Sequence, residues 1–270
     1  METCPKKIMS SSEESLESLA RMRIGNPTQK LIPVAQVSSH DASNFCKDFV
    51  FDVYDKIAPH FSHTRYKMWP KVSEFVRSLP AYSFLIDAGC GNGKNLQASS
   101  HLLRWGSDRS FPFCEIAKDK AGCDTLQTDI SRDMGRAFRV NVFDAAIAIA
   151  VLHHIPTVEG RIGALKEMHR LLRNGGAALV YVWAMEQKKG TIGARSFESQ
   201  DIFVPWNLQS GYLKPEEGVP QGNIVPLQRY YHVFREDEFR DLLAMVPEFK
   251  VDEVYYDNNN WAARLTAVKL

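Results

Sequence analysis

A short apolar run followed by an acid and three alternate glycines is the feature that most constrains how this chain of 270 residues folds. Phe84–Ile86 has the composition of a buried parallel strand, and Asp87 ends it. Glycines then stand at every second position from 89 to 93, where a missing Cβ lets the backbone turn sharply and approach a ligand closely. We expect a helix near 93–99, with its free N–H groups facing whatever the loop holds.

Three kinds of ligand loop compete for this stretch. A dinucleotide fingerprint needs a glycine where this chain has Lys94. A P-loop needs a glycine in place of Ala88 and a serine or threonine in place of Asn95. The pattern Asp-x-Gly-x-Gly-x-Gly after a strand resembles the first motif of the class I S-adenosylmethionine-dependent methyltransferases. A glycine-rich turn without a ligand stays an alternative, although a plain turn would not need three glycines with their cost in backbone entropy.

The rest of the chain alternates strand-like and helix-like segments, which predicts an α/β fold with a mostly parallel sheet covered by helices on both faces. We expect strands near 83–87, 102–107, 123–127, 144–150 and 177–183. Further helices are expected near 111–120, 159–173 and 236–245. Two last β runs, joined by Asp257–Asn260, predict an antiparallel hairpin. A mostly parallel seven-stranded sheet with such a C-terminal hairpin again resembles the Rossmann-like class I methyltransferases.

The chain outside this core divides into a few further segments. Residues 1–42 have little to bury and are expected to form a mobile extension, which leaves 43–270 as one methyltransferase domain. An amphipathic helix is expected from Phe45 until it ends near Pro59, followed by a polar, aromatic loop. Residues 211–228, rich in proline, glycine and charge, predict a long surface loop.

Charge and cysteine usage limit the classes of function. The net charge is +1, so any nucleic acid would have to bind a local patch rather than a basic molecule as a whole. None of the five cysteines forms a C-x-x-C pair, which indicates no structural zinc site. The longest apolar run, 145–152, is too short to span a bilayer. We therefore expect no membrane association and a cytoplasmic protein, with the nucleus as a second location.

Asp87 and the loop Gly89–Gly93 are expected to cradle the methionine portion of S-adenosylmethionine. The acids after the next strands complete this donor site, because ligands bind at the carboxyl ends of parallel strands. Asp108 is placed to accept both ribose hydroxyls of S-adenosylmethionine, or else to cap the helix after Ser110. Asp129 is placed to accept from the adenine amino group with Ile130 on the ring, or else is an exposed loop acid. The predicted cofactor-binding residues are Asp87, Gly89, Gly91, Asn92, Gly93, Asp108, Arg109, Asp129, Ile130 and Ala150.

Longer stretches resemble one family, the eukaryotic tRNA wobble-uridine carboxymethyl methyltransferases. The family includes the yeast enzyme and the methyltransferase domain of the AlkB-homologue fusion protein. The resemblance covers about 45–270, and its most specific parts are Phe61–Pro70 and Asp201–Trp206. Further matching stretches are Tyr54–His60, Ile86–Lys94, Gly106–Ser110, Ala150–His154, Val182–Gln187 and Arg229–His232.

The resemblance implies that the carboxylate of a 5-carboxymethyluridine at the anticodon wobble position attacks the donor methyl. A carboxylate is ionised near neutral pH, so the enzyme must supply alignment rather than a strong base. Arg65 is the first candidate to hold the carboxylate and Arg229 the second, while either His153 or His154 contacts the base or its sugar. The predicted catalytic residues are Arg65, His153, Trp183 and Arg229, and the predicted substrate-binding residues are Trp69, His154, Lys67, Tyr231 and Trp206.

The resemblance also implies two partners, a tRNA anticodon loop and a small zinc-binding activator subunit. Cations that flank the expected cleft are the candidates for phosphate contacts: Lys67, Lys71, Lys188, Lys189, Arg195 and Arg235. Surface lysines without a partner are the ordinary alternative. Two other functions stay open, a small-molecule carboxyl methyltransferase of the same fold and a catalytically silent protein that keeps the fold to bind partners.

Overall fold

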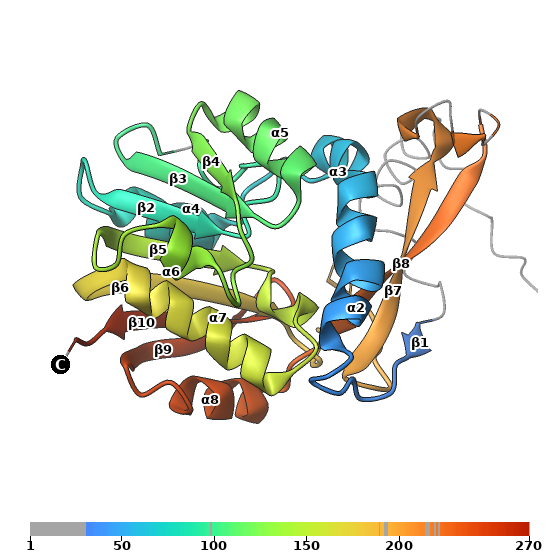
Figure 1. Ribbon diagram of the computed structural model, residues 1–270. Helices are drawn as coiled ribbons and strands as arrows, with labels where there is room; N and C mark the ends of the chain where they lie inside the picture. The colour runs from blue at the N-terminus through green and yellow to red at the C-terminus, as the bar shows by residue number, and fades with distance from the viewer. Residues whose placement is uncertain are drawn as a thin grey trace, which may run out of the picture.

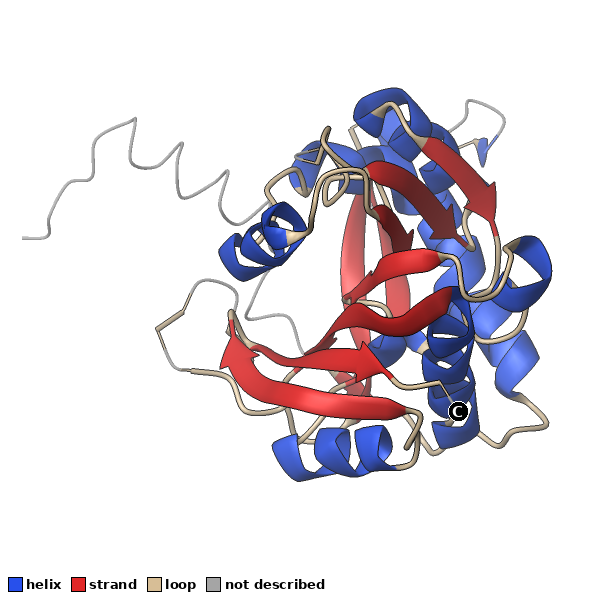
Figure 2. Cartoon of the chain, turned by 90° about the vertical axis from the view of Figure 1, so that its left-hand side faces the viewer, coloured by secondary structure: helices blue, strands red, loops and turns tan. Residues whose placement is uncertain are grey.

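The main sheet of the protein has seven strands in the order β4-β3-β2-β5-β6-β10-β9. The computed structural model describes residues 31–97, 99–188, 190–191, 194–213, 217–218, 220 and 222–269. The strands of the sheet are β2 (Phe84–Ala88), β3 (Leu103–Asp108), β4 (Asp124–Gln127), β5 (Phe143–Ile149), β6 (Leu172–Trp183), β9 (Phe249–Asp257) and β10 (Asn260–Ala267). Strands β2 to β6 run parallel, and β10 is antiparallel to both β6 and β9. Figure 2 shows the twist of the strands across this sheet.

Helices cover both faces of the sheet (Figure 1). One apolar core lies between the sheet and α6, α7 and α8, and the other lies between the sheet and α4 and α5. These helices are α4 (Pro70–Ser78), α5 (Phe111–Ala121), α6 (Met134–Ala137), α7 (Val158–Leu171) and α8 (Glu236–Ala244). Burial on both faces explains why the central strand β5 is almost wholly apolar.

Local sequence sets several of the helix ends. Pro70 opens α4, where its missing N–H costs no hydrogen bond. The Thr157 hydroxyl accepts from the Gly160 N–H at the start of α7. Gly122 ends α5 in the left-handed conformation, with φ +61°. These signals are local, so the helices they bound were predictable from sequence.

A second, three-stranded sheet lies beside the main one and was not predicted as a sheet. It has the order β1-β7-β8 and consists of β1 (Ile32–Pro33), β7 (Asp201–Gln209) and β8 (Ile224–His232), all antiparallel. The expected loop over 211–228 is therefore too long, since β8 already begins at Ile224. Alternate residues of β7 are buried, from Ile202 to Leu208, which is the two-residue period of a strand with one covered face.

A long helical segment stands between the two sheets (Figure 1). It consists of α2 (Ala42–Cys46), a π-helical turn η1 (Lys47–Phe51) and α3 (Asp52–Thr64). The expected end near Pro59 is wrong, because α3 runs through the proline to Thr64. Apolar packing outweighs the hydrogen bond that the proline forfeits: Ala58 is fully buried, and the Phe61 ring stacks on Trp206 of β7, with centroids 5.7 Å apart.

The predicted N-terminal extension falls mostly outside the described residues, since the description starts at residue 31. From there, Ile32 pairs with Phe203 of β7. The boundary at residue 43 stays a prediction. No helix in the described part of the chain is long and apolar enough to cross a bilayer.

Candidate active site

Two cavities lie next to each other at the edge of the main sheet where its parallel strands end. The first has a volume of about 470 Å³ and the second about 890 Å³. Tyr54, Phe61, Lys94, Ala150 and His154 line both cavities and form their shared wall. The two cavities therefore adjoin at these five residues, and a group bound in one can meet a group bound in the other.

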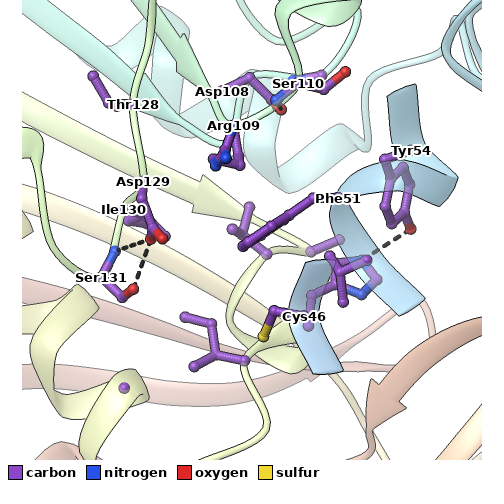
Figure 3. Close-up of a pocket in the computed structure, with 18 of the residues that line it drawn as sticks. Cys46, Phe51, Tyr54, Asp108, Arg109, Ser110, Thr128, Asp129, Ile130 and Ser131 are labelled. Carbon is purple, nitrogen blue, oxygen red and sulfur yellow. Dashed lines mark hydrogen bonds between the residues drawn. The ribbon is translucent and has the colours of Figure 1, made fainter. Parts of the chain in front are cut away.

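The first cavity is enclosed by loops on one side and by helix on the other. Figure 3 shows Asp108–Ser110 and Thr128–Ser131, which follow β3 and β4, across from Phe51 and Tyr54 of the helical segment. The π-helical turn η1 ends at Phe51, and such turns are frequent at functional sites. The Arg109 guanidinium lies 4.8 Å from the centre of the Phe51 ring, so the two sides of the cavity touch.

The glycine loop has a backbone that other residues rarely adopt. Gly89 and Gly91 have φ of +85° and +52°. A Cβ on Gly89 would lie 2.4 Å from the Cγ2 of Val151, whereas one on Gly91 would meet no atom within 4 Å. Gly89 therefore allows close packing below the loop, and Gly91 leaves space above it for a ligand.

The expected helix near 93–99 is wrong in its described part. Residues 91–97 form turns, with the Gly93 N–H bonded to Cys90 O and the Leu96 N–H bonded to Gly93 O. Left-handed φ values at Gly91 and Gly93 interrupt helical geometry there. Loop backbone, rather than a helix N-terminus, therefore faces the cavity.

The two acids predicted to hold the donor both line the first cavity. Asp108 accepts from the Gly91 N–H through Oδ2 (2.8 Å) and from the Ser110 N–H through Oδ1 (2.9 Å), so it also orders the start of α5. Burial raises the pKa of the Asp108 carboxyl to about 6. Asp129 accepts from the Ser131 N–H and hydroxyl through Oδ1. Both carboxylates are held in place by their own loops.

Asp87 lies beneath the loop and is not one of the described residues that line the first cavity. Its Oδ2 accepts from the Asn95 amide at 3.2 Å, and Asn95 does line the cavity. Burial raises the pKa of Asp87 to about 7. The structure thus gives Asp87 an indirect place in the site, through Asn95.

Ala150 and Asn92 connect the two cavities. Ala150 directly follows β5 and has φ +64°, in the left-handed region, which strains a residue that has a Cβ and is typical of functional sites. The Asn92 side chain donates to the backbone oxygen of Arg65 at 2.8 Å. The glycine loop of the first cavity thereby fixes the segment that carries Arg65 into the second.

The second cavity presents three guanidinium groups: those of Arg195 and Arg229 are buried and that of Arg65 is half-buried. Arg229 is 6% exposed, and its Nη1 donates to the hydroxyls of Tyr231 (2.8 Å) and Tyr54 (3.4 Å). Burial and the nearby Arg229 lower the pKa of Arg65 to about 10. Neither Arg65 nor Arg229 forms an ion pair with a carboxylate of the described residues. Asp257, the one acid among the described lining residues, accepts from the Tyr181 hydroxyl.

The two histidines have different hydrogen-bonding roles. His154 donates from Nδ1 to the carbonyl of Tyr230 and accepts at Nε2 from the Tyr54 hydroxyl, both at 2.9 Å. Burial lowers its pKa to about 3, so the ring is neutral. His153 accepts at Nδ1 from the Trp183 N–H at 3.2 Å, and burial also lowers its pKa. A neutral His153 therefore carries its proton on Nε2.

Aromatic rings form part of the wall beside these histidines. Trp183 and Tyr231 lie 4.4 Å apart between ring centres, and His153 stacks on Tyr231 at 4.8 Å. Trp69 also lines the second cavity and packs on Tyr181. Trp206 lines neither cavity among the described residues; it is buried under both arginines, 4.7 Å from the Arg229 guanidinium carbon and 5.5 Å from that of Arg65.

The cations predicted to flank the cleft separate into two groups. Lys67, Lys188 and Arg195 line the second cavity, whereas Lys71 and Arg235 are absent from its described lining. Lys189 lies outside the described residues. Sequence reasoning missed Tyr54 and Lys94 as site residues, although both stand in the stretches that carry the family resemblance.

Comparison with known proteins identifies the family. A family profile described as "Methyltransferase domain" matches residues 86–180. The Schizosaccharomyces pombe tRNA (carboxymethyluridine(34)-5-O)-methyltransferase is 40% identical over 220 residues, which cover 79% of this chain and 94% of that protein. The chain belongs to the tRNA (carboxymethyluridine(34)-5-O)-methyltransferase family.

Relatives of this methyltransferase differ in length. The Xenopus tropicalis tRNA (carboxymethyluridine(34)-5-O)-methyltransferase alkbh8 is 35% identical over 278 residues, and the match covers 88% of this chain but 44% of that protein. The human "Probable tRNA methyltransferase 9B" is 42% identical over 168 residues, which cover 62% of this chain and 35% of that protein. This chain therefore spans less than half of these two relatives.

Solved structures confirm the class I methyltransferase fold. A Burkholderia thailandensis 1,6-didemethyltoxoflavin-N1-methyltransferase with bound S-adenosylhomocysteine matches with a TM-score of 0.58 and 16% identity, covering 88% of this chain and 95% of the other. A Haloferax volcanii methyltransferase in complex with the Trm112 methyltransferase activator matches with a TM-score of 0.52 and 13% identity, covering 80% and 98%. The predicted sheet with its antiparallel C-terminal hairpin is thus confirmed.

S-adenosylmethionine is the cofactor of this methyltransferase, and the first cavity fits it. Gly91 leaves space at the loop where the methionine portion is expected, and the Asp108 and Asp129 carboxylates stand where the ribose and adenine are expected. The buried hydroxyls of Ser110 and Thr128 line the same cavity without a hydrogen-bond partner among the described residues. The role of each predicted binding residue stays a prediction.

Proposed function

We propose that this protein transfers a methyl group from S-adenosylmethionine to the carboxylate of 5-carboxymethyluridine at the wobble position of a tRNA anticodon, which forms a methyl ester. One observation carries the proposal. In the cavity next to the cofactor cavity Arg229 is buried and Arg65 is half-buried, and neither forms an ion pair with a carboxylate of the described residues. Buried cations without a counter-ion favour an anionic substrate.

The protonation states of His154 and Tyr54 in this cavity favour an acceptor that binds already deprotonated. His154 is neutral and uses both ring nitrogens within the protein. Burial raises the pKa of Tyr54 well above its usual range, so its hydroxyl is a donor and not a base. A carboxylate has no proton to lose near neutral pH, and S-adenosylmethionine supplies an electrophilic sulfonium methyl group. Arg65 and Arg229 would hold one carboxylate oxygen and leave the other free to react.

The hydrogen bonds favour His153 over His154 as the histidine that contacts substrate. His153 lines the second cavity and carries a proton on Nε2, for which no acceptor is present among the described residues. The nearby rings of Trp183 and Tyr231 can receive a base that has left the anticodon stack. Lys67 and Lys188, both exposed, would neutralise backbone phosphates at the rim, whereas Arg195 is buried.

An activator subunit would have a suitable edge of the sheet to bind. Strand β4 is the outer strand beside β3, so one side of its backbone is unpaired within the described sheet. Leu126 on β4 and Leu103 on β3 are 38% and 43% exposed, and a partner could cover both. The Haloferax volcanii complex supplies the likeness, and the partner proposed here is a small zinc-binding activator.

We propose a cytoplasmic location, with the nucleus as a second one. The four described cysteines are free thiols, as expected in a reducing compartment. Imaging of a fluorescent fusion would test this, and secretion of the fusion would contradict it.

The decisive assay combines the purified protein, its activator and S-adenosylmethionine with tRNA that carries 5-carboxymethyluridine. We expect a base-labile methyl ester on the modified nucleoside, detected by mass spectrometry of the digested tRNA. The matched control is the same tRNA with unmodified uridine, which offers no carboxylate. Esterification of free carboxylic acids at the same rate as tRNA would favour a small-molecule enzyme. No ester despite measured cofactor binding would leave a silent binding protein.

A further inference from the structure

Lys94 is a cation in the shared wall of the two cavities, and neither the sequence prediction nor the family comparison assigns it a role. It follows Gly93, whose backbone packs closely on α5: a Cβ added to Gly93 would lie 2.9 Å from the Cα of Ala117. The backbone at Lys94 is therefore held firmly. Its side chain lines both cavities and lies with Nζ 5.4 Å from the centre of the Trp69 ring.

The ammonium group of Lys94 lacks a counter-ion within the described protein. It forms no ion pair with a described carboxylate. Asp87 is the acid nearest to Lys94 in the sequence. It lies below the loop, where its Oδ2 accepts a hydrogen bond from the Asn95 side-chain amide. Burial and the neighbouring Arg65 lower the pKa of Lys94 to about 8, while Asp87 opposes this shift. A half-buried cation next to another cation is costly unless an anion joins it.

The other cations of the first cavity stand elsewhere. Arg109 lies over the Phe51 ring. Arg132 lines the cavity from the segment after β4, three residues beyond Asp129. Arg65 and Arg229 line only the second cavity among the described residues. At the glycine-loop end of the first cavity, Lys94 is thus the one lysine or arginine in the described lining.

We propose that the Lys94 ammonium is the counter-ion of a ligand carboxylate at the junction of the two cavities, namely the amino-acid carboxylate of the methyl donor. The glycine loop is where the amino-acid portion of the donor is expected, and this portion ends in a carboxylate. A second source has the same chemistry, because the proposed acceptor also carries a carboxylate. The inference rests on the proposed function only for that second source.

Titration calorimetry with two ligands tests the inference without tRNA. S-adenosylhomocysteine carries the amino-acid carboxylate, whereas 5′-methylthioadenosine lacks the whole amino-acid portion. Lys94→Met should weaken S-adenosylhomocysteine binding about 10-fold or more and leave 5′-methylthioadenosine binding within about twofold. Lys94→Arg should recover most of the loss. Lys118→Met, on an exposed position of α5, is the matched control and should bind both ligands like the wild type.

The remaining outcomes separate the two carboxylates from an error in the inference. Unchanged S-adenosylhomocysteine binding with a KM for carboxymethyluridine tRNA raised about 10-fold would assign the acceptor carboxylate to Lys94. Equal loss of both small ligands would indicate a damaged cavity and overturn the inference, as would no change in any measurement. Wild-type protein that binds S-adenosylhomocysteine but makes no ester refutes the proposed function alone.

Discussion

The two cavities are built in different ways. The first is made mostly of short loops that each follow a parallel strand, from Gly89 after β2 to Ala150 after β5. The second gathers side chains from across the chain, from Arg65 to the turn at Asp257–Asn260. Motif spacing alone can reveal a site of the first kind, whereas a site of the second kind exists only once both sheets are in place.

The two cavities also differ in the ionisable groups around them. Acids Asp87 and Asp108 belong to the donor side, with pKa values raised by burial. Arg65 and Arg229, with two neutral histidines, belong to the acceptor side. The described lining of the first cavity has three acids, Asp108, Asp129 and Glu159, and three cations, Lys94, Arg109 and Arg132, whereas that of the second has Asp257 as its one acid. The excess of cations that suits a carboxylate therefore lies on the acceptor side.

The largest effect is expected from Gly89→Ala, which should weaken S-adenosylhomocysteine binding by more than about 100-fold. The added Cβ would lie 2.4 Å from Val151, and φ +85° is unfavourable for alanine. Calorimetry measures the loss. Gly122→Ala is the control, since φ is +61° there but a Cβ meets nothing within 4 Å. Equal binding by both variants would show that the close packing under the loop is not needed.

Arg65→Ala should lower kcat/KM for carboxymethyluridine tRNA about 30- to 100-fold and leave cofactor binding unchanged, because it removes charge-assisted hydrogen bonds to the acceptor only. Steady-state kinetics and calorimetry on the same preparation separate the two effects. Arg77→Ala, at an exposed position of α4, is the control. A parallel loss of cofactor affinity would move Arg65 out of the acceptor side.

Asp87→Asn should change how stability depends on pH. Burial raises the folded-state pKa of Asp87 from 3.8 to about 7, so its stabilising contribution is complete below pH 3.8 and is lost as the pH rises towards 7. Asparagine does not titrate. The free energy of unfolding of the variant, relative to wild type, should therefore rise by about 1.4 kcal/mol per pH unit between about pH 4 and 7.

Urea unfolding at pH 5, 6 and 7 measures this difference. His154 acts in the opposite sense, because burial lowers its pKa from 6.5 to about 3 and its contribution is lost as the pH falls below 6.5. Taking the difference between variant and wild type removes the histidine contribution, which both share. Asp119→Asn, at an exposed position of α5, is the matched control. Parallel curves for Asp87→Asn would show that Asp87 is already ionised in the folded protein.

The smallest effect is expected from Tyr54→Phe, which should lower turnover on carboxymethyluridine tRNA about fivefold. The Tyr54 hydroxyl donates to His154 and accepts from Tyr231 and Arg229, so its loss leaves Arg229 less firmly positioned. Cofactor affinity should stay unchanged, since this hydroxyl bonds to the acceptor side. Tyr82→Phe, at a residue 79% exposed, is the control. A loss of cofactor affinity instead of turnover would assign Tyr54 to the donor side.

Sequence reasoning succeeded where the signal was local. Phe84–Ala88 was predicted as a buried strand within one residue of its start, and Gly122 ends α5 close to the expected position. It failed where distant contacts compete with local preference. Pro59 predicts a helix end, yet packing of Phe61 on Trp206 carries α3 onward. The β7–β8 pairing joins strands separated by a loop rich in turn residues, which hid the second sheet.

Residue types in the site were predicted better than their contacts. Arg65 and Arg229 were expected to face the acceptor, and both line the second cavity. Trp206 was expected to bind substrate, but the structure buries it beneath these arginines. The sequence does not indicate which face of β7 is covered, because that depends on where α3 packs.

The sequence by itself determined the class of this protein: a strand, an acid and a glycine loop fix the backbone within a few residues, since glycine alone tolerates left-handed φ without strain. Tertiary structure alone decided which nitrogen of each histidine carries the proton and where Lys94 stands. Both depend on burial and on hydrogen-bond partners from segments remote in the chain, such as Tyr54 on His154 and Trp69 beside Lys94.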